Sequence, residues 1–371
     1  MDESTSSPWE DFFFQLEEAT GASSTMAQAA YERTIAGTNA VIKSLDVPVG
    51  LSPKDLVWSL NKTKLYRYRP SPKAEKQHRI PLLLVYALIN KPFILDLVPG
   101  RSFVEHLLDS GFDVFLLDWG SPGAEDVTIT FDDYVTNYLY RAVRKVLRLS
   151  GADEVSLLGQ CLGATLTVTF AALYPEVPLR NIILLTAPLD FSGPPASSMV
   201  MWLEDLDVDK LVDSLGNVPG EMIRHWAKLL KPVENFVGVY VNLYKLLGDQ
   251  NAVWSWQAIN RWVEDVVPVA GEAFRQFAVD YVEKNKLFRG KHIINGRRAD
   301  LANIRASLLN IIAKYDHLVS PSQAMTIMDL VSSTDKELKV IPSTHVGIVI
   351  SRRAKHQLWP EVSAWLGDRS D

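Results

Sequence analysis

The single cysteine of this 371-residue chain, Cys161, lies at the centre of the pentapeptide Gly159-Gln160-Cys161-Leu162-Gly163. An apolar stretch over 154–158 precedes the pentapeptide, and a helix-compatible stretch over 164–174 follows it. A nucleophile on a tight turn between a strand and a helix needs small neighbours at these two glycine positions. The alternative is an inert cysteine that packs in the core as a small apolar residue. The strand, turn and helix around Cys161 favour a thiol nucleophile.

A thiol nucleophile needs a base to take its proton, and the base needs a group that orients it. Asp316 follows an expected strand at 308–313, and His345 follows an expected strand at 338–341. Both side chains can then reach the sheet edge that carries Cys161. The order nucleophile, acid, histidine along the chain is that of the α/β-hydrolase fold. We therefore predict a catalytic triad of Cys161, Asp316 and His345.

Other polar residues close to these strand ends have structural interpretations. His317 is the rival base, but it is adjacent to Asp316 and the two side chains should diverge, so we expect His317 to hold Asp316 or its loop. Asp118 and Asp190 also lie at the ends of expected strands, and we expect both to cap nearby backbone N–H groups. Asp118 also precedes Cys161 in the chain, which argues against it as the acid of the triad.

An acyl-transfer site also needs backbone donors for the oxyanion that forms in the transition state. In this fold one donor is the N–H of the residue after the nucleophile, here Leu162, and the other comes from the loop after an early strand. The loop 88–91 follows an expected strand at 81–87, and we assign the second donor to Ile89. The alternative is that 88–91 is an ordinary turn between a strand and a helix.

The elements that must position these groups alternate along the chain, which predicts a mostly parallel sheet covered by helices on both faces. Further strands are expected at 63–69, 113–119 and 181–186, and helices at 102–110, from Thr130 onward and at 356–366. Thr130 and Asp133 have the spacing of a capping box, which marks the start of a long helix.

Between about 190 and 302 the strand pattern stops, and Trp, Leu and Val recur at helical spacings. We therefore predict an α/β-hydrolase core at 61–189 and 303–371, a helical cap or lid at 190–302 and an N-terminal helical segment at 1–60. A cap is expected because ligands bind at the carboxyl ends of such strands. The alternative is a second packing domain without a gating role.

Composition excludes several classes of protein. The net charge of −6 argues against nucleic-acid binding and against a cationic membrane face. One cysteine allows no internal disulfide and no multi-cysteine metal site, which suits the cytoplasm. The polar, acidic start is unlike a signal peptide, and the longest apolar runs are about half a membrane span, so no transmembrane segment is expected. No cofactor and no metal are predicted.

Several segments, in order along the chain, resemble the polyhydroxyalkanoate synthases, specifically the short catalytic subunit of the two-component class III type. The similarity begins at about residue 50. It rests on Pro81–Pro92, Asp118-Trp119-Gly120, the pentapeptide around Cys161, Gly216–Glu221, the stretch around Asp207, Asp316–Val319 and His345-Val346-Gly347. The chain departs from the common form of the elbow, Gly-x-Cys-x-Gly-Gly, in having Ala164 at the last position.

The resemblance implies an acyltransferase that polymerises (R)-3-hydroxyacyl-CoA, such as 3-hydroxybutyryl-CoA, and releases CoA. It places the family's catalytic Cys, Asp and His on Cys161, Asp316 and His345. It also implies a second, non-catalytic subunit (PhaE-type), a homodimer of catalytic subunits and a cytoplasmic location at polyester granules. Asp316 could orient His345 or activate the attacking hydroxyl. The rivals are a cysteine thioesterase or polyester depolymerase with the same triad, and a non-catalytic binding or granule-coat protein.

Overall fold

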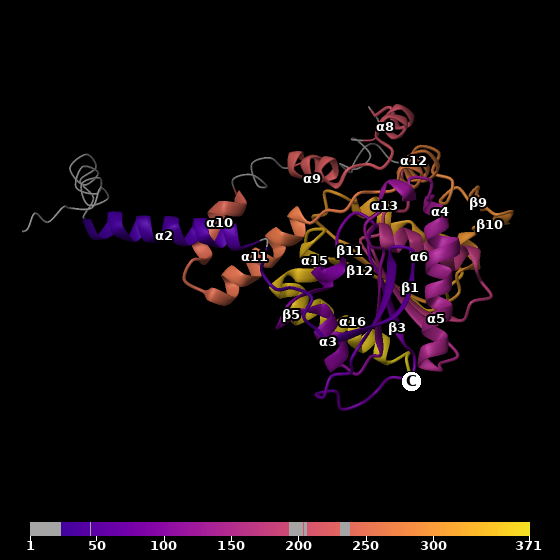
Figure 1. Ribbon diagram of the computed structural model, residues 1–371. Helices are drawn as coiled ribbons and strands as arrows, with labels where there is room; N and C mark the ends of the chain where they lie inside the picture. Colours follow the sequence, from indigo (N-terminus) through magenta and orange to yellow (C-terminus); the bar gives the residue numbers. More distant parts are fainter. Residues whose placement is uncertain (1–23, 45, 193–202, 204–205, 231–237) are drawn as a thin grey trace, which may run out of the picture. The chain divides into compact units, whose positions relative to one another are not determined.

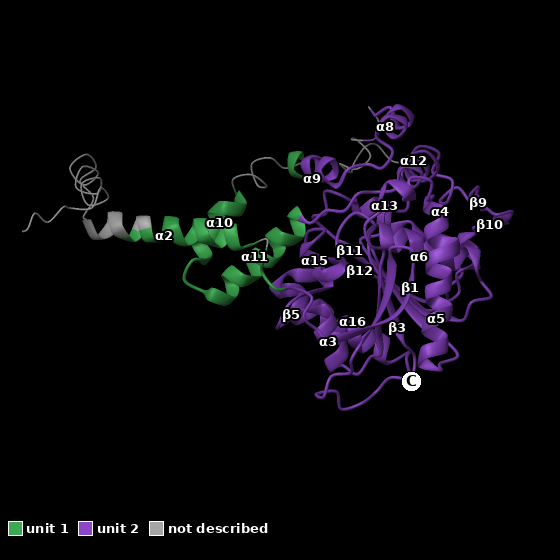
Figure 2. Ribbon diagram, in the orientation of Figure 1, with its two compact units in different colours: residues 1–48, 228–264 green, residues 49–227, 265–371 purple. Residues whose placement is uncertain are grey.

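The computed structural model describes residues 24–44, 46–192, 203, 206–230 and 238–371 (Figure 1). The chain divides into two compact units (Figure 2). One unit comprises residues 1–48 and 228–264, and the other comprises residues 49–227 and 265–371.

Among the described residues of the second unit, eight strands form one sheet in the order β1-β2-β6-β3-β7-β8-β11-β12. Their bounds are β1 Lys54–Leu60, β2 Thr63–Tyr68, β3 Leu82–Val85, β6 Val114–Asp118, β7 Val155–Gln160, β8 Leu179–Leu185, β11 Ser307–Ala313 and β12 Lys336–Ile341. Strand β2 runs antiparallel to both of its neighbours, and all other pairs are parallel. The predicted α/β-hydrolase fold with a mostly parallel sheet is therefore confirmed.

Helices lie on both sides of this sheet, with α3 and α16 on one side and α5 and α6 on the other (Figure 1). Their bounds are α3 Phe103–Asp109, α4 Phe131–Asp133, the π-helical η3 Tyr134–Leu139, α5 Tyr140–Ser150, α6 Leu162–Leu173, α13 Pro321–Met325, α14 Ile327–Leu330, α15 Gly347–Ile350, the π-helical η7 Ala354–Leu358 and α16 Trp359–Gly367. The predicted capping box is present, because Thr130 Oγ1 accepts a hydrogen bond from Asp133 N at 3.0 Å and Thr130 N donates to Asp133 Oδ2 at 2.8 Å. Helix α6 is buried on all sides, since the sheet and the outer helices enclose it.

Further helices fall in the region predicted to be a helical insertion. They are α8 Val208–Leu215, α9 Gly220–Leu229, α10 Val239–Leu246, α11 Gln250–Glu264, α12 Gly271–Gln276 and the π-helical η5 Phe277–Glu283. Residues 228–264 belong to the same unit as 1–48, while the described residues on either side of them belong to the unit that contains the sheet. A cap role for 190–302 stays a prediction.

Two strand regions correct the sequence analysis. The predicted helical segment 1–60 holds helix α2, Ser24–Lys43, but its last seven residues form β1. The β1–β2 pairing shifts register between Leu56 and Trp58, and this irregularity breaks the alternation that would identify a strand. Within 190–302 the short strands Ile293–Ile294 and Arg297–Arg298 pair as a hairpin. Its turn, Asn295-Gly296, has positive φ at both residues, and this Asn-Gly pair was the available signal.

The first unit has a small core of its own between α2, α10 and α11. Ala40, Leu243 and Trp256 are buried there, and Val253 and Leu246 are among the apolar side chains packed against them. Gln257 Nε2 donates to Ala40 O at 2.9 Å, and Arg261 donates to Val47 O at 2.6 Å. These bonds satisfy carbonyls at and beyond the carboxyl end of α2, where helices leave acceptors unpaired.

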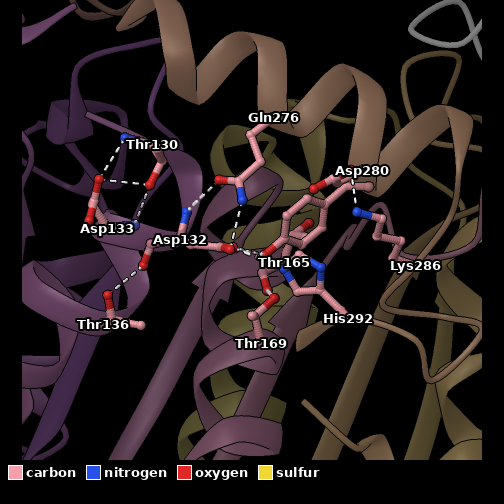
Figure 3. Close-up of polar contacts among 11 residues, drawn as sticks. Thr130, Asp132, Asp133, Thr136, Thr165, Thr169, Gln276, Asp280, Lys286 and His292 are labelled. Atoms are coloured by element: carbon pink, nitrogen blue, oxygen red, sulfur yellow. Dashed lines mark hydrogen bonds and ion pairs between the residues drawn. The ribbon is translucent and has the colours of Figure 1, made fainter. Parts of the chain in front are cut away.

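A buried polar cluster in the second unit joins helix α4 to the segment 276–292 (Figure 3). One oxygen of Asp132 accepts a hydrogen bond from the Tyr281 hydroxyl at 3.0 Å and lies 2.9 Å from His292 Nε2. The other accepts from Gln276 Nε2 at 2.7 Å, while Gln276 Oε1 accepts from Asp132 N at 2.9 Å. Burial, followed by the charge of Asp132, raises the pKa of Tyr281 well above its ordinary value. The Tyr281 hydroxyl also bonds to Thr169 of helix α6, so the cluster reaches that helix.

Asp132→Ala should destabilise the fold by about 3 kcal/mol, because His292 and Tyr281 would remain buried without their shared acceptor. Asp153→Ala is the matched control, since Asp153 is exposed, and it should change the free energy of unfolding by less than about 0.5 kcal/mol. Urea unfolding followed by circular dichroism measures both. Equal stabilities of the two variants would show that the cluster contributes nothing.

Candidate active site

Cys161 occupies a strained turn between β7 and α6. Its φ of 53° and ψ of −126° lie in a region that non-glycine residues rarely adopt. Cys161 N donates to Leu185 O of the neighbouring strand β8 at 3.0 Å, and Cys161 O accepts from Ala164 N at 2.9 Å. The turn is therefore held from the sheet side and from the helix side at once.

The two glycines of the pentapeptide permit this turn through close contacts. A Cβ on Gly163 would lie 2.1 Å from Val85 O and 2.5 Å from Tyr86 O, at the end of β3. A Cβ on Gly159 would lie 2.5 Å from the Cα of Ala164. Ala164 fits here because its side chain is as small as a side chain can be, and it is fully buried. These close contacts are the physical reason why positions 159 and 163 require residues without a side chain.

Asp316 and His345 lie together beyond the ends of β11 and β12. Asp316 Oδ2 is 2.7 Å from His345 Nδ1, and Asp316 Oδ1 accepts hydrogen bonds from Leu318 N at 2.9 Å and Val319 N at 3.0 Å. The side chain of Asp316 has no exposed surface. Both oxygens of this carboxylate therefore accept hydrogen bonds from groups that the fold holds in place.

Backbone hydrogen bonds continue the β11–β12 pairing past the strands and hold the two loops side by side. Lys314 N donates to Ile341 O at 2.8 Å, and Tyr315 N donates to Ser343 O at 2.9 Å. The second bond joins the residue just before Asp316 to the residue two positions before His345. The relative position of acid and base is consequently set by the sheet.

The imidazole of His345 also forms a hydrogen bond with the side chain of Cys161, so the structure brings the three predicted triad residues together. Burial disfavours the charged imidazole, but the negative charge on Cys161 and the hydrogen bond and charge of Asp316 outweigh it and raise the pKa of His345 to about 10. A protonated imidazole beside a sulfur stabilises the thiolate, which is the nucleophilic form of cysteine.

The remaining predicted site residues have simpler surroundings. Leu162 is the first residue of α6, where N–H groups have no partner within the helix, so its N–H suits an oxyanion donor. The carbonyl of Ile89 accepts a hydrogen bond from Val267 N at 3.2 Å, and Ile89 is half-buried. His317 is half-buried next to Asp316. The oxyanion roles of Leu162 and Ile89 and the supporting role of His317 stay predictions.

The two other aspartates at strand ends have the capping contacts that we expected. Asp118 Oδ1 accepts from Gly120 N at 3.0 Å, and Asp190 Oδ1 accepts from Ser192 N at 2.9 Å. Over the described residues no group of three or more His, Cys, Asp and Glu could hold a metal ion. Within the same residues, no helix has the length and apolar character needed to cross a membrane.

Thr186 is a residue beside the nucleophile that the sequence does not single out. It directly follows β8 with a φ of 48°, and its N donates to Ile311 O of β11 at 2.9 Å. A positive φ at a β-branched residue has no sequence signature. The available signal was its position at the carboxyl end of the strand next to β7.

Comparisons with known proteins identify the fold and the relatives of this chain. A profile of the alpha/beta hydrolase fold matches residues 80–349, and a profile of the N-terminus of poly-beta-hydroxybutyrate polymerase (PhaC) matches residues 28–107. The poly(3-hydroxyalkanoate) polymerase subunit PhaC of Haloferax mediterranei is 39% identical over 342 residues, which cover 92% of this chain and 69% of that protein. The subunit of the same name from Allochromatium vinosum is 35% identical over 346 residues, which cover 93% of this chain and 97% of its own length.

Two solved structures share the fold at low sequence identity. A monoacylglycerol lipase of Paleococcus ferrophilus has a TM-score of 0.52 at 16% identity and covers 82% of this chain and 99% of its own. A putative lipase of Sulfolobus solfataricus has a TM-score of 0.54 at 12% identity and covers 86% of this chain and 98% of its own. At such identities the likeness shows the fold alone.

Gly163→Ala should destabilise the protein by about 3 kcal/mol or prevent folding, because its Cβ would collide with the carbonyl oxygens of Val85 and Tyr86. Gly248→Ala is the matched control, since no atom lies within 4 Å of a Cβ at that position. Thermal and urea unfolding compare the two variants. A Gly163→Ala protein as stable as the control would mean that the helix and β3 do not need this close approach.

The raised pKa of His345 predicts a pH dependence of stability. Protonation of His345 stabilises the fold fully below about pH 6.5, the ordinary pKa of histidine, and this contribution is lost as the pH rises toward 10. We expect the free energy of unfolding of the wild type to fall more steeply across this window than that of His345→Gln. Urea unfolding at unit steps of pH measures the difference, and parallel profiles for the two proteins would rule out a charged His345.

Proposed function

The chain belongs to the PhaC family of poly(3-hydroxyalkanoate) polymerases, and we propose that it polymerises (R)-3-hydroxyacyl-CoA into polyester through an acyl group carried on Cys161. The observation that carries the proposal is the hydrogen-bonded series Cys161, His345 and Asp316 at the ends of β7, β12 and β11. The relatives carry the polymerase activity in their names, and 3-hydroxybutyryl-CoA is the substrate we expect first.

The first step is transfer of the acyl group from CoA to the enzyme. The proton of the Cys161 thiol is held on His345, and the thiolate attacks the thioester carbonyl. Backbone N–H groups of Leu162 and Ile89 stabilise the oxyanion. When the intermediate collapses, the bond to the CoA sulfur breaks, CoA leaves with the proton from His345, and the acyl group remains on Cys161 as a thioester. One thioester replaces another, so the acyl group stays activated.

The second step forms the ester bond of the polymer. The hydroxyl of a hydroxyacyl group attacks a thioester carbonyl, gives its proton to His345 and displaces the cysteine sulfur. For Asp316 we propose the orienting role. The hydrogen bond that Asp316 Oδ2 accepts from His345 Nδ1 and the two that Oδ1 accepts from backbone N–H groups support it, since these donors hold a carboxylate that has no exposed surface.

A polymerase must keep water from the acyl-enzyme, because hydrolysis ends the chain. Counted as whole residues, backbone included, Cys161, His345 and Asp316 are 7%, 6% and 8% exposed, which supports this requirement. We propose that residues 190–302 act as the cap that controls entry. The thioesterase or depolymerase alternative shares the triad, and the names of the relatives, which are polymerase subunits, favour polymerisation over it.

We further propose that the chain works with a second, non-catalytic PhaE-type subunit, as a homodimer, at the surface of polyester granules in the cytoplasm. The word subunit in the relatives' names supports a partner chain. The lone cysteine suits a reducing compartment.

The proposal predicts that the protein, with and without a candidate second subunit, releases CoA from (R)-3-hydroxybutyryl-CoA and yields insoluble polyester. Cys161→Ala should stop both, because no sulfur remains to carry the acyl group, while its unfolding midpoint stays near that of the wild type. A mass increase of one acyl group at Cys161 should be seen in the wild type. CoA release with free 3-hydroxybutyrate as the sole product would favour the thioesterase, and an unreactive thiol would favour a non-catalytic protein.

A further inference from the structure

Thr186 lies beside the nucleophile across the end of the sheet. Gln160 of β7 pairs with Leu185 of β8, so one further step along both parallel strands brings Cys161 opposite Thr186. Cys161 N donates to Leu185 O, and Thr186 N donates to Ile311 O of the strand that leads to Asp316. Backbone hydrogen bonds of Leu185 and Thr186 therefore connect this end of β8 to the nucleophile strand on one side and to the acid strand on the other.

The backbone of Thr186 is strained. Among the described residues, the non-glycine positions with positive φ are Asn61, Cys161, Thr186, Asn285 and Asn295. Asparagine tolerates this conformation, and Cys161 forms the turn that presents the nucleophile. Thr186 is β-branched, for which a positive φ is a true outlier. Strain of this kind persists where the surroundings enforce it, and it gathers at functional sites.

The hydroxyl of Thr186 has no hydrogen-bond partner within the described part of the chain, although the residue is only 1% exposed. The buried threonines of α6 differ in this respect. The hydroxyls of Thr165, Thr167 and Thr169 donate to backbone carbonyls at 2.9, 2.8 and 2.8 Å. A buried hydroxyl without a partner destabilises a fold, and valine has the same shape without that cost. Packing therefore gives no reason for a threonine at position 186.

We propose that the Thr186 hydroxyl donates a hydrogen bond to the oxygen on the third carbon of the acyl group that Cys161 carries. That oxygen is a hydroxyl in a single hydroxyacyl unit and an ester oxygen in a growing chain, and it accepts a hydrogen bond in both. Neighbouring strands lie about 4.8 Å apart, which four bonds from the cysteine sulfur to that oxygen can span. The inference rests on the proposed acyl-enzyme, and it makes Thr186 a determinant of specificity for 3-hydroxyacyl groups.

The test compares two CoA thioesters that differ in this oxygen, (R)-3-hydroxybutyryl-CoA and butyryl-CoA, in a single round of CoA release that acylates Cys161. Thr186→Val should slow acylation by 3-hydroxybutyryl-CoA about tenfold and leave the rate with butyryl-CoA unchanged. Thr186→Ser keeps the hydroxyl and should return the ratio of the two acylation rates to its wild-type value. The unfolding midpoint of Thr186→Val should equal or exceed that of the wild type, since the unpartnered hydroxyl is gone.

Thr167→Val is the matched control, because its hydroxyl already bonds to the carbonyl of Gly163 and any effect should fall on both thioesters alike. Equal slowing of both thioesters by Thr186→Val would assign Thr186 a structural role and overturn the proposal, and so would two unchanged rates. If the wild type releases CoA but forms no polyester, polymerisation fails as a function, while the comparison of acylation rates still decides the role of Thr186.

Discussion

The contact between the start of helix α6 and the end of strand β3 is the constraint on which the site depends. No side chain fits between Gly163 and the carbonyl oxygens of Val85 and Tyr86. At this close approach the chain passes from β7 into α6 through a positive φ at Cys161, which places the nucleophile at the carboxyl end of β7. The same approach brings the first N–H groups of the helix beside the loop after β3, where an oxyanion would need them.

The sheet also fixes the positions of the charged groups in the site. Three adjacent strands, β7, β8 and β11, run from the nucleophile to the acid, and β12 at the sheet edge leads to the base. A carboxylate with no exposed surface is costly unless its donors are fixed, and Asp316 has two backbone N–H groups and one imidazole. The negative charge on Cys161 and the hydrogen bond with Asp316 raise the pKa of His345 against the effect of burial, so the imidazole keeps a proton that is available to a leaving sulfur.

Much of the fold and of the candidate site could be predicted from the sequence, because the signals that identify them are local. Short apolar runs predicted the inner strands, and the glycine spacing identified the turn at Cys161. Asp316 and His345 could be assigned because each follows a strand in the chain order of the fold. Strand β1 was not predicted, because the register shift between Leu56 and Trp58 hides the alternation of apolar and polar residues.

Features that need distant residues could not be predicted in this way. The Asp132 cluster joins residues that are 144 to 160 positions apart, and its polar side chains look like those of any solvated helix end. Thr186 has an ordinary residue type, and both its φ and its unpartnered hydroxyl exist only in the folded chain.

The lone cysteine has a consequence for oxidation. A cysteine oxidised to a sulfenic acid is normally rescued when a second thiol of the protein condenses with it to form a disulfide. This sequence holds no second cysteine, so an oxidised Cys161 has no resolving partner in its own chain. Repair must come from a thiol outside the chain, and that thiol must reach a residue that is only 7% exposed. The burial that protects an acyl group therefore also protects the bare sulfur from oxidants and delays its recovery once it is oxidised.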